Sequence, residues 1–229
     1  MGAIWAPVGL IMKKLLAILV LGLFLITPSQ ADDIRDFQIE GMSIGDSALD
    51  YFTKNEMEKY KAYYPKSKKW VMFAKSVSSF ETYDSIQVHF KDSDSKYIIG
   101  TLDGSINYIN NMKECYKKMD EIENEISKIF KNTKQTREEN ISHSWDKSGK
   151  SKVTAIEYLF ESGDIAILEC VDWSDELDFT DSLTLKIGTK EFVYFIQNEA
   201  YQQTHKKTFR DRGSGFVEIS SYILWDNCY

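Results

Sequence analysis

The chain has 229 residues, of which 43% are hydrophobic and 28% charged, and its formal net charge is −7 at pH 7. This balance is typical of a folded, soluble protein and excludes a disordered chain. The acidic charge also excludes nucleic acid as an expected partner, because a polyanion is repelled by a negatively charged protein.

The N-terminal region, residues 1–31, has the pattern of a signal peptide. Two lysines precede the apolar run 15–26, and the small residues Ser29 and Ala31 follow at the positions that a signal peptidase reads. We therefore expect the protein to be exported and the mature chain to be periplasmic or secreted. The expected compartment, the expected disulfide and the expected envelope role all depend on this export.

Two points about this leader stay open. The true start is either Met1 or Met12, and we favour Met12 because a longer leader would place two lysines inside the membrane. Cleavage before Asp32 is favoured over retention, because the apolar run is shorter than the ~20 residues that a spanning helix needs. An uncleaved leader would be the protein's only expected contact with a membrane.

Residues 32–130 are expected to form an N-terminal α+β half. Ser43 with an acid three residues later predicts a first short helix, and a second is predicted from Asn55 to Pro65. Short apolar or alternating runs then predict three antiparallel strands. These strands are 70–77, 83–90 and 96–102, the last closed by a turn at Asp103-Gly104.

The strongest periodic pattern lies at 111–130, where apolar residues recur every three or four positions. It predicts a long amphipathic helix. Fewer than three heptads are present, so packing on the protein's own sheet is favoured over a coiled-coil dimer. The polar segment 131–151 that follows is expected to be a loop.

Residues 152–201 are expected to form a C-terminal α+β half. Its predicted strands are 154–160, 165–173 and 183–187, and a helix capped by Thr189 follows to Tyr201. The tail, 202–229, is left without an assigned structure. The fold class expected is thus α+β with two similar halves, each an antiparallel sheet of about three strands packed by helices, around a long central amphipathic helix.

Three cysteines remain in the mature chain: Cys115, Cys170 and Cys228. In an oxidising compartment two buried thiols normally pair, and Cys115 and Cys170 both fall in regular predicted elements. We expect a Cys115–Cys170 disulfide. Cys228, next to the terminus, is expected to be a free thiol or to pair between molecules. Their spacing is not that of a metal site.

No hydrolase, nucleotide-binding or metalloprotease motif is present, so we assign no catalytic, cofactor or metal residue. An acidic segment, 172–181, could hold a cation or a basic partner, although a solvated loop is favoured. Trp173 within it could stack on a ligand or complete a core. His89 is expected to face solvent, and His143 has only its residue type to suggest chemistry.

Several segments resemble a group of secreted proteins of marine alphaproteobacteria, of the Pelagibacter kind, to which no activity is assigned. The similarity covers most of 34–201, including both internal cysteines, and it implies export but carries over no site residue. The segments that carry it are Ile39–Ser47, Leu49–Phe52, Cys115–Lys118, Asp146–Ser151 and Glu169–Ser174.

These observations favour an exported, non-enzymatic binding or envelope-interaction module that uses a sheet face or a groove between the halves. Its expected partner is an envelope protein or a small ligand. An envelope hydrolase without a recognisable motif is the alternative. A small-ligand carrier is a further alternative, and it would need a sizeable apolar cavity.

Overall fold

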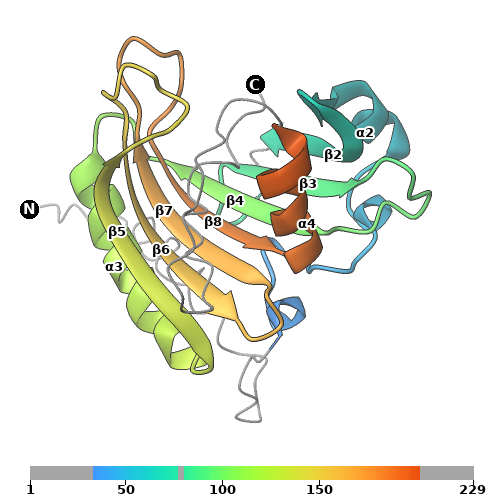
Figure 1. Ribbon diagram of the computed structural model, residues 1–229, viewed down its shortest axis with the longest axis horizontal. Coiled ribbons are helices and arrows are strands. Elements are labelled where there is room, and N and C mark those ends of the chain that lie inside the picture. The colour runs from blue at the N-terminus through green and yellow to red at the C-terminus, as the bar shows by residue number, and fades with distance from the viewer. Residues whose placement is uncertain (1–32, 77–79, 202–229) are drawn as a thin grey trace, which may run out of the picture.

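The computed structural model describes residues 33–76 and 80–201 (Figure 1), so the assignments made for the leader, the tail and Cys228 lie outside the described residues. One eight-stranded antiparallel sheet dominates, in the order β1-β2-β3-β4-β8-β7-β6-β5. Its strands are β1 (Lys61–Tyr64), β2 (Ser67–Ser76), β3 (Ser85–Lys91), β4 (Thr101–Asn107), β5 (Thr133–Ser142), β6 (Lys152–Phe160), β7 (Ile165–Asp172) and β8 (Ser182–Gly188).

The expected fold class is wrong, because the two parts of the chain share one sheet. Strands β1–β4 and β5–β8 each form a meander of four strands. The last strand of the first meander, β4, pairs with the last strand of the second, β8, so that Thr101 lies opposite Gly188 and Asn107 opposite Ser182. The expectation had three strands in each half and a helix at the centre. Neither half has a sheet of its own, so neither is a separate structural unit.

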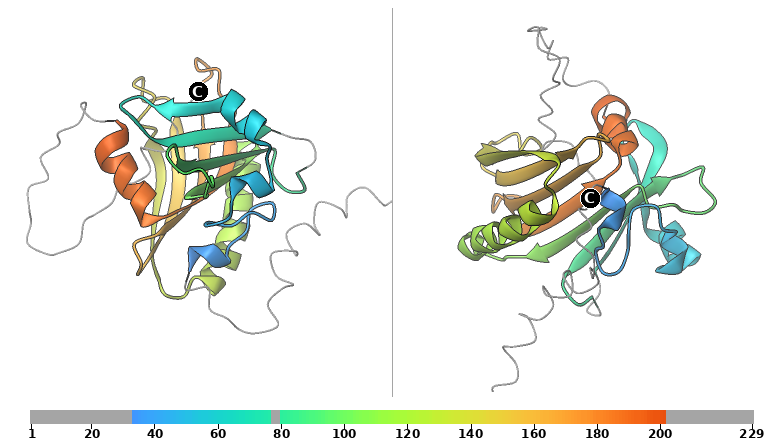
Figure 2. Two further views of the ribbon diagram at one scale, coloured as in Figure 1. Left: turned by 90° about the vertical axis from the view of Figure 1, so that its right-hand side faces the viewer. Right: turned by 90° about the horizontal axis from the view of Figure 1, so that it is seen from below.

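Helices lie on both faces of this sheet (Figures 1 and 2). We call one the α3 face, where α3 packs with the N-terminal segment over one apolar cluster, and the other the α4 face, where α4 packs over a second cluster. The helices are α2 (Lys54–Tyr60), α3 (Met112–Ile129) and α4 (Lys190–Phe195), with single turns η2 (Ile34–Asp36), η3 (Ala48–Asp50) and η4 (Ile196–Ala200).

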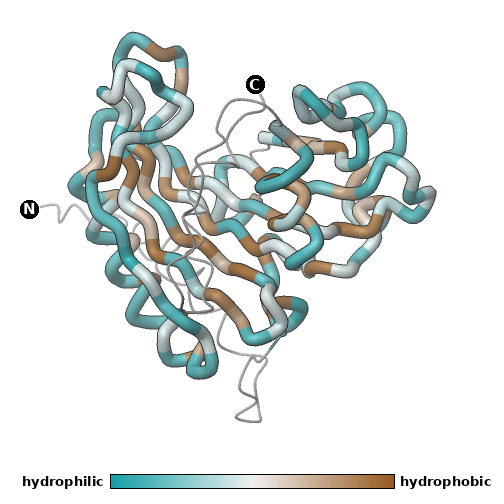
Figure 3. The backbone as a smooth tube through the Cα atoms, in the orientation of Figure 1, coloured by the Kyte–Doolittle hydropathy of each residue, from teal (hydrophilic) through white to brown (hydrophobic). Residues whose placement is uncertain are grey.

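Burial on both faces explains the composition of the strands. Strands β6, β7 and β8 are buried over almost their whole length. Most side chains of β7 are therefore apolar on both faces, whereas in β8 the apolar Leu183, Leu185 and Ile187 alternate with polar residues that are buried on the other face. Figure 3 shows the hydrophobic residues gathered along these inner strands and the hydrophilic ones on the outer elements. The exceptions, charged residues inside the inner strands, form the site described below.

Helix α3 occupies nearly the expected range, but it lies against one face of the sheet and is not a central element. Its buried side chains, Cys115, Met119 and Ile126, point toward the strands and its charged residues point away. The helix is amphipathic because only one side of it has a neighbour.

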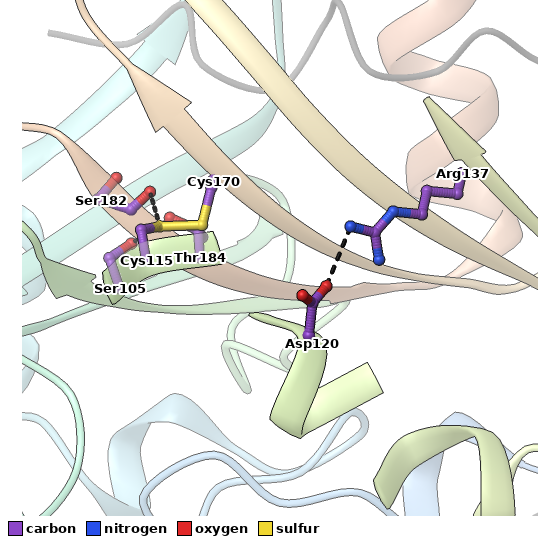
Figure 4. The surroundings of a disulfide bond; sticks show 7 residues. All are labelled: Ser105, Cys115, Asp120, Arg137, Cys170, Ser182 and Thr184. Carbon is purple, nitrogen blue, oxygen red and sulfur yellow. Dashed lines mark hydrogen bonds and ion pairs between the residues drawn. A yellow bond between two sulfur atoms is a disulfide. The ribbon is translucent and has the colours of Figure 1, made fainter. Parts of the chain in front are cut away.

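The segment 131–151, expected to be a loop, contains the edge strand β5. The sequence does not predict this strand because most of its side chains are polar and exposed. Its extended conformation is stabilised instead by antiparallel pairing with β6. Arg137 on β5 also binds α3, with its guanidinium 3.0 Å from Asp120 (Figure 4). The same guanidinium lies 2.5 Å from Glu123. Charged side chains of this kind are common on edge strands, where they discourage pairing with other chains.

Asp103-Gly104, expected to be a turn, lies in the middle of β4. Gly104 is needed there because a Cβ at this position would come within 2.7 Å of Tyr83 and 2.8 Å of Ile39. The glycine therefore permits close packing rather than a reversal of the chain. This difference matters for the site, because it places Asp103 inside the sheet.

The N-terminal helices also differ from expectation. The first is only the single turn η3, capped by Ser47 rather than Ser43. The second, α2, begins after Thr53, whose side chain and that of Glu56 form a capping box. Hydrogen bonds from Lys75 and Thr53 lower the pKa of Glu56 to about 2. Tyr64, expected on this helix, belongs to β1 and points to the α4 face.

Cys115 and Cys170 form the expected disulfide, with their Cα atoms 6.1 Å apart (Figure 4). It joins α3 to β7 across the α3 face, between residues 55 positions apart in the sequence. Both cysteines are fully buried. The bond therefore links the helix covalently to the inner part of the sheet.

Replacing both cysteines by serine should lower the free energy of unfolding by roughly 4 kcal/mol, the chain-entropy value for a loop of this length. Urea titration of the exported, oxidised protein measures the loss. A Cys228→Ser variant is the control, and it should unfold at the wild-type urea concentration. Two free internal thiols in the wild-type protein, detected by mass spectrometry under non-reducing conditions, would contradict the assignment.

Candidate functional site

The α4 face carries a group of polar and charged side chains in the middle of the sheet. Gln87, Asp103 and Lys186 lie opposite one another on β3, β4 and β8. In the adjacent row, Thr184 on β8 lies opposite Glu169 on β7. Residues paired across antiparallel strands project to the same side, so the register alone brings these side chains together.

Glu169 and Lys186 form a buried ion pair. The ammonium of Lys186 lies 2.6 Å from a carboxylate oxygen of Glu169, and the two side chains are only 3% and 2% exposed. Transferring both charges out of water is costly, and a buried pair of this kind is often no more stabilising than two apolar residues. Its presence in two buried strands therefore indicates a role other than stability.

Asp103 lies beside this pair with one of its two carboxylate oxygens engaged. Its Oδ2 is 3.6 Å from Nε2 of His89, whereas its Oδ1 is buried and has no hydrogen-bond partner among the described residues. Asp103 itself is 4% exposed. A buried carboxylate oxygen without a donor is unfavourable by about 1–3 kcal/mol or more, so a donor is expected to reach it.

His89 is held in place from both sides of its ring. Its Nδ1 is 2.6 Å from the hydroxyl of Tyr64, and its Nε2 is 3.0 Å from the amide nitrogen of Gln87. The ring also packs against Phe192 of α4, with centroids 4.8 Å apart. His89 is 1% exposed, so the expectation that it faces solvent is wrong. It does lie on the face opposite the apolar side chains of β3, but α4 covers that face.

A cavity of about 360 Å³ opens above these residues. Strands β3, β4, β7 and β8 form its floor, where Gln87, Asp103, Glu169 and Lys186 are among the lining side chains. The connection between β7 and β8 supplies the rim, including Trp173 and Phe179. The cavity thus spans the junction of the two meanders, and most of its lining residues are polar.

The rim is an ordered aromatic structure. The ring of Trp173 packs 4.8 Å from that of Phe179 and 4.4 Å from that of His143, and Trp145 lies 5.1 Å from Phe179. The backbone N–H of Trp173 donates to Asp181 at 2.8 Å. Trp173 consequently completes a small core and also lines the cavity, and its stacking on a ligand stays a prediction.

The acidic segment 172–181 forms this rim. Burial, with the nearby charges of Asp181 and Asp175, raises the pKa of Asp172. Asp178 lines the cavity, and Glu176 pairs with Lys150. In the described part of the chain, no three His, Cys, Asp or Glu side chains are grouped so that they could hold a metal ion. The segment is thus a partly exposed loop that forms one side of the cavity.

Asp146 holds the neighbouring loop. Its carboxylate accepts hydrogen bonds from the backbone N–H groups of Ser148 and Ser151, both at 2.8 Å, and from the hydroxyl of Ser151 at 2.7 Å. Hydrogen bonds from Ser148 and Ser151 hold the pKa of Asp146 well below its usual range. Ser151 in turn accepts from the N–H of Ser174, at the start of the rim. His143, buried beside Trp173, belongs to the same packed loop.

The sequence pattern missed the residues that make this site. The pattern predicts a turn at Asp103 and places Glu169 and Lys186 in strands with no special role. Their signal is nevertheless present, since Glu169 interrupts the otherwise apolar run 165–171 and Lys186 is the single charged residue of the predicted strand 183–187. A charged residue in a strand that is buried on both faces needs a partner of opposite charge. The acidic residue of one strand and the basic residue of the other can be each other's partner.

Comparisons with protein-family models, with curated proteins and with solved structures found no match to this chain. The similarity to secreted alphaproteobacterial proteins therefore stays a prediction. Within residues 33–76 and 80–201, no helix has the length and apolar character needed to cross a bilayer.

Replacing one member of the buried ion pair should be far more damaging than replacing both. Lys186→Met leaves a buried carboxylate without its cation, so we expect a loss of about 3–5 kcal/mol in the free energy of unfolding. Glu169→Leu combined with Lys186→Met should regain most of it. Urea unfolding measures all variants. Lys69→Met, which breaks an exposed pair with Glu199, is the control and should change stability by less than about 1 kcal/mol.

Asp146 should make the protein sensitive to acid. Because its folded-state pKa is depressed, the stability it contributes is present above about pH 4, the ordinary aspartate value, and is lost as pH falls below it. Asp146→Ala should therefore lower the unfolding temperature at pH 7 and flatten its dependence on pH below 4. Glu161→Ala, at an exposed turn, serves as the control. Parallel curves for wild type and Asp146→Ala would contradict this role.

Proposed function

We propose that the chain is an exported, non-enzymatic binding protein, periplasmic or secreted, that takes a small polar ligand into the cavity of its α4 face. One observation carries the proposal: Asp103 is one of the residues that line this cavity, and its buried Oδ1 has no hydrogen-bond partner among the described residues. The leader sequence and the Cys115–Cys170 disulfide support export.

The size and lining of the cavity define the ligand in broad terms. About 360 Å³ is near the lower end of the ~300–1,000 Å³ typical of ligand sites. The carrier considered from the sequence required an apolar cavity, whereas only Val171, Trp173 and Phe179 among the lining residues are apolar. Hydrogen bonds and charge, rather than burial of an apolar surface, would thus supply most of the specificity.

The floor of the site is rigid, which favours binding. Its charged groups project from the middle of paired strands, and Ser105 and Thr184 fix each other's hydroxyls at 2.9 Å. Groups held in this way need little reordering when a ligand arrives, so less binding energy is lost. A sheet that also joins two meanders is a suitable support for such a site.

The alternative, an envelope hydrolase, rests on the proximity of Asp103 to His89. A histidine beside a carboxylate is a common acid–base arrangement. Here, however, Tyr64 and Gln87 already contact the two ring nitrogens. In the described part of the chain, His89 is also not among the residues that line the cavity. Catalysis would require the ring to leave these contacts, so binding is the better-supported function.

A cavity-filling variant tests the proposed site. A panel of small amines, carboxylic acids, alcohols, amino acids and sugars is screened against the mature protein by thermal unfolding. A ligand present at 100 times its Kd should stabilise the protein by about 2.7 kcal/mol, a rise of several degrees. Ser105→Leu places a larger side chain in the cavity and should abolish that rise. Ser162→Leu, at the hairpin turn of β6 and β7, should preserve it.

Two outcomes would overturn the proposal. One is that no compound in the panel raises the unfolding temperature, and the other is that Ser105→Leu responds like the wild type. Ester and phosphate hydrolysis is measured on the same samples. Turnover that His89→Gln removes would support the hydrolase instead.

A further inference from the structure

We infer that the ligand of this cavity is a small organic cation, a protonated amine whose ammonium group binds Asp103. The inference rests on the proposed binding function and specifies its ligand. It depends on four features of the site: the charge of its lining, the free oxygen of Asp103, the aromatic rim and the geometry of the acidic groups.

The charged residues that line the cavity are mostly acidic. Asp103, Glu169 and Asp178 are the carboxylates, and Lys186 is the one ammonium among the described lining residues. Lys186 lies 2.6 Å from Glu169, so these two charges neutralise each other within the floor. Asp103 at the floor and Asp178 at the rim remain, and a cation is the complementary ligand.

The unpaired oxygen of Asp103 determines the kind of donor that is needed. An ionised carboxylate only accepts hydrogen bonds, and its Oδ1 has no donor among the described residues, whereas Oδ2 lies 3.6 Å from the His89 ring. Neutral hydroxyls and charged ammonium groups could both donate to it. In a buried site of low dielectric the charged donor is favoured, because such hydrogen bonds are about twice as strong as neutral ones.

The rim suits the remainder of an organic cation. Trp173 and Phe179 line the cavity with their ring centroids 4.8 Å apart, and Trp173 is held there by its hydrogen bond to Asp181. Aromatic faces attract ammonium groups and also cover apolar carbon chains. Near Asp103, hydroxyl groups such as those of Ser105 and Thr184 can satisfy further N–H groups.

A metal cation does not fit these features. The described residues hold no group of three or more His, Cys, Asp or Glu side chains placed to ligate a metal ion. Hard cations such as Ca²⁺ require six to eight oxygen ligands close together, whereas Asp103 and Asp178 lie on the floor and the rim respectively. An amine needs only one carboxylate and a few neutral acceptors.

Calorimetry with matched compounds tests the charge and donor requirements on the wild-type protein. Butylamine, butanol and butyrate have the same carbon chain, and tyramine adds an aromatic ring. Tetramethylammonium carries the charge without N–H donors. We expect butylamine to bind at least tenfold more tightly than butanol, butyrate to give no detectable heat, and tetramethylammonium to bind more weakly than butylamine. Magnesium and zinc chlorides should not compete.

Asp103→Asn then tests the residue. It keeps the shape of the side chain but removes its charge, and it should weaken butylamine binding at least tenfold. Asp178→Asn, at the exposed rim, should weaken it less than threefold. If Asp103→Asn fails to fold, the wild-type comparison of butylamine with butanol decides the inference without it.

The results separate the two proposals. If neutral or anionic compounds bind and Ser105→Leu blocks them, the cavity is a ligand site but the inference of a cation is wrong. If butylamine binds no better than butanol, or binds Asp103→Asn equally well, the inference is also wrong. If nothing binds, both proposals fail.

Discussion

The antiparallel pairing of β4 with β8 is the interaction on which the rest of this structure depends. It joins two meanders that are distant in the sequence, and it gives a sheet wide enough to be covered by α3 and the N-terminal segment on one face and by α4 on the other. It also sets the register that places Asp103 opposite Lys186. Without it, the charged residues of the floor would lie on two separate edges exposed to solvent.

The elements predicted correctly from the sequence are those whose patterns are local. The stripe of α3 and the cap at Thr189 each depend on neighbouring residues. Strand β5 could not be predicted because its order comes from β6 and from Arg137, whose partners lie on α3. The number of strands per meander, and hence the single sheet, depends on such contacts between distant segments.

The site was harder to predict than the strands that carry it. A polar residue in an alternating strand is usually interpreted as facing water, as His89 was. That interpretation fails when a second layer covers the polar side of the strand. Phe192 and Phe195 of α4 pack against the ring of Tyr64, which in turn contacts His89, so the entire group is enclosed. Which face of a strand is covered is decided by the tertiary fold.

The disulfide and the cavity are connected through a single strand. In β7, Cys170 points to α3 while Glu169, its immediate neighbour, points to the cavity on the opposite face. The covalent bond to α3 therefore restrains, from behind, the strand that carries one partner of the buried ion pair. Glu169 and Lys186 gain from this restraint, because a buried pair is favourable only while its geometry is maintained.

The cost of that ion pair is consistent with a binding role. An apolar pair at Glu169 and Lys186 would give a simpler core, but it would remove two of the charged groups that line the cavity. The pair adds no net charge to the mostly polar lining of the cavity, which also includes Asp103 with its unpaired Oδ1. The floor of the cavity thus keeps a buried acceptor without a donor among the described residues, an arrangement that is unfavourable for the fold and that the proposed binding role would explain.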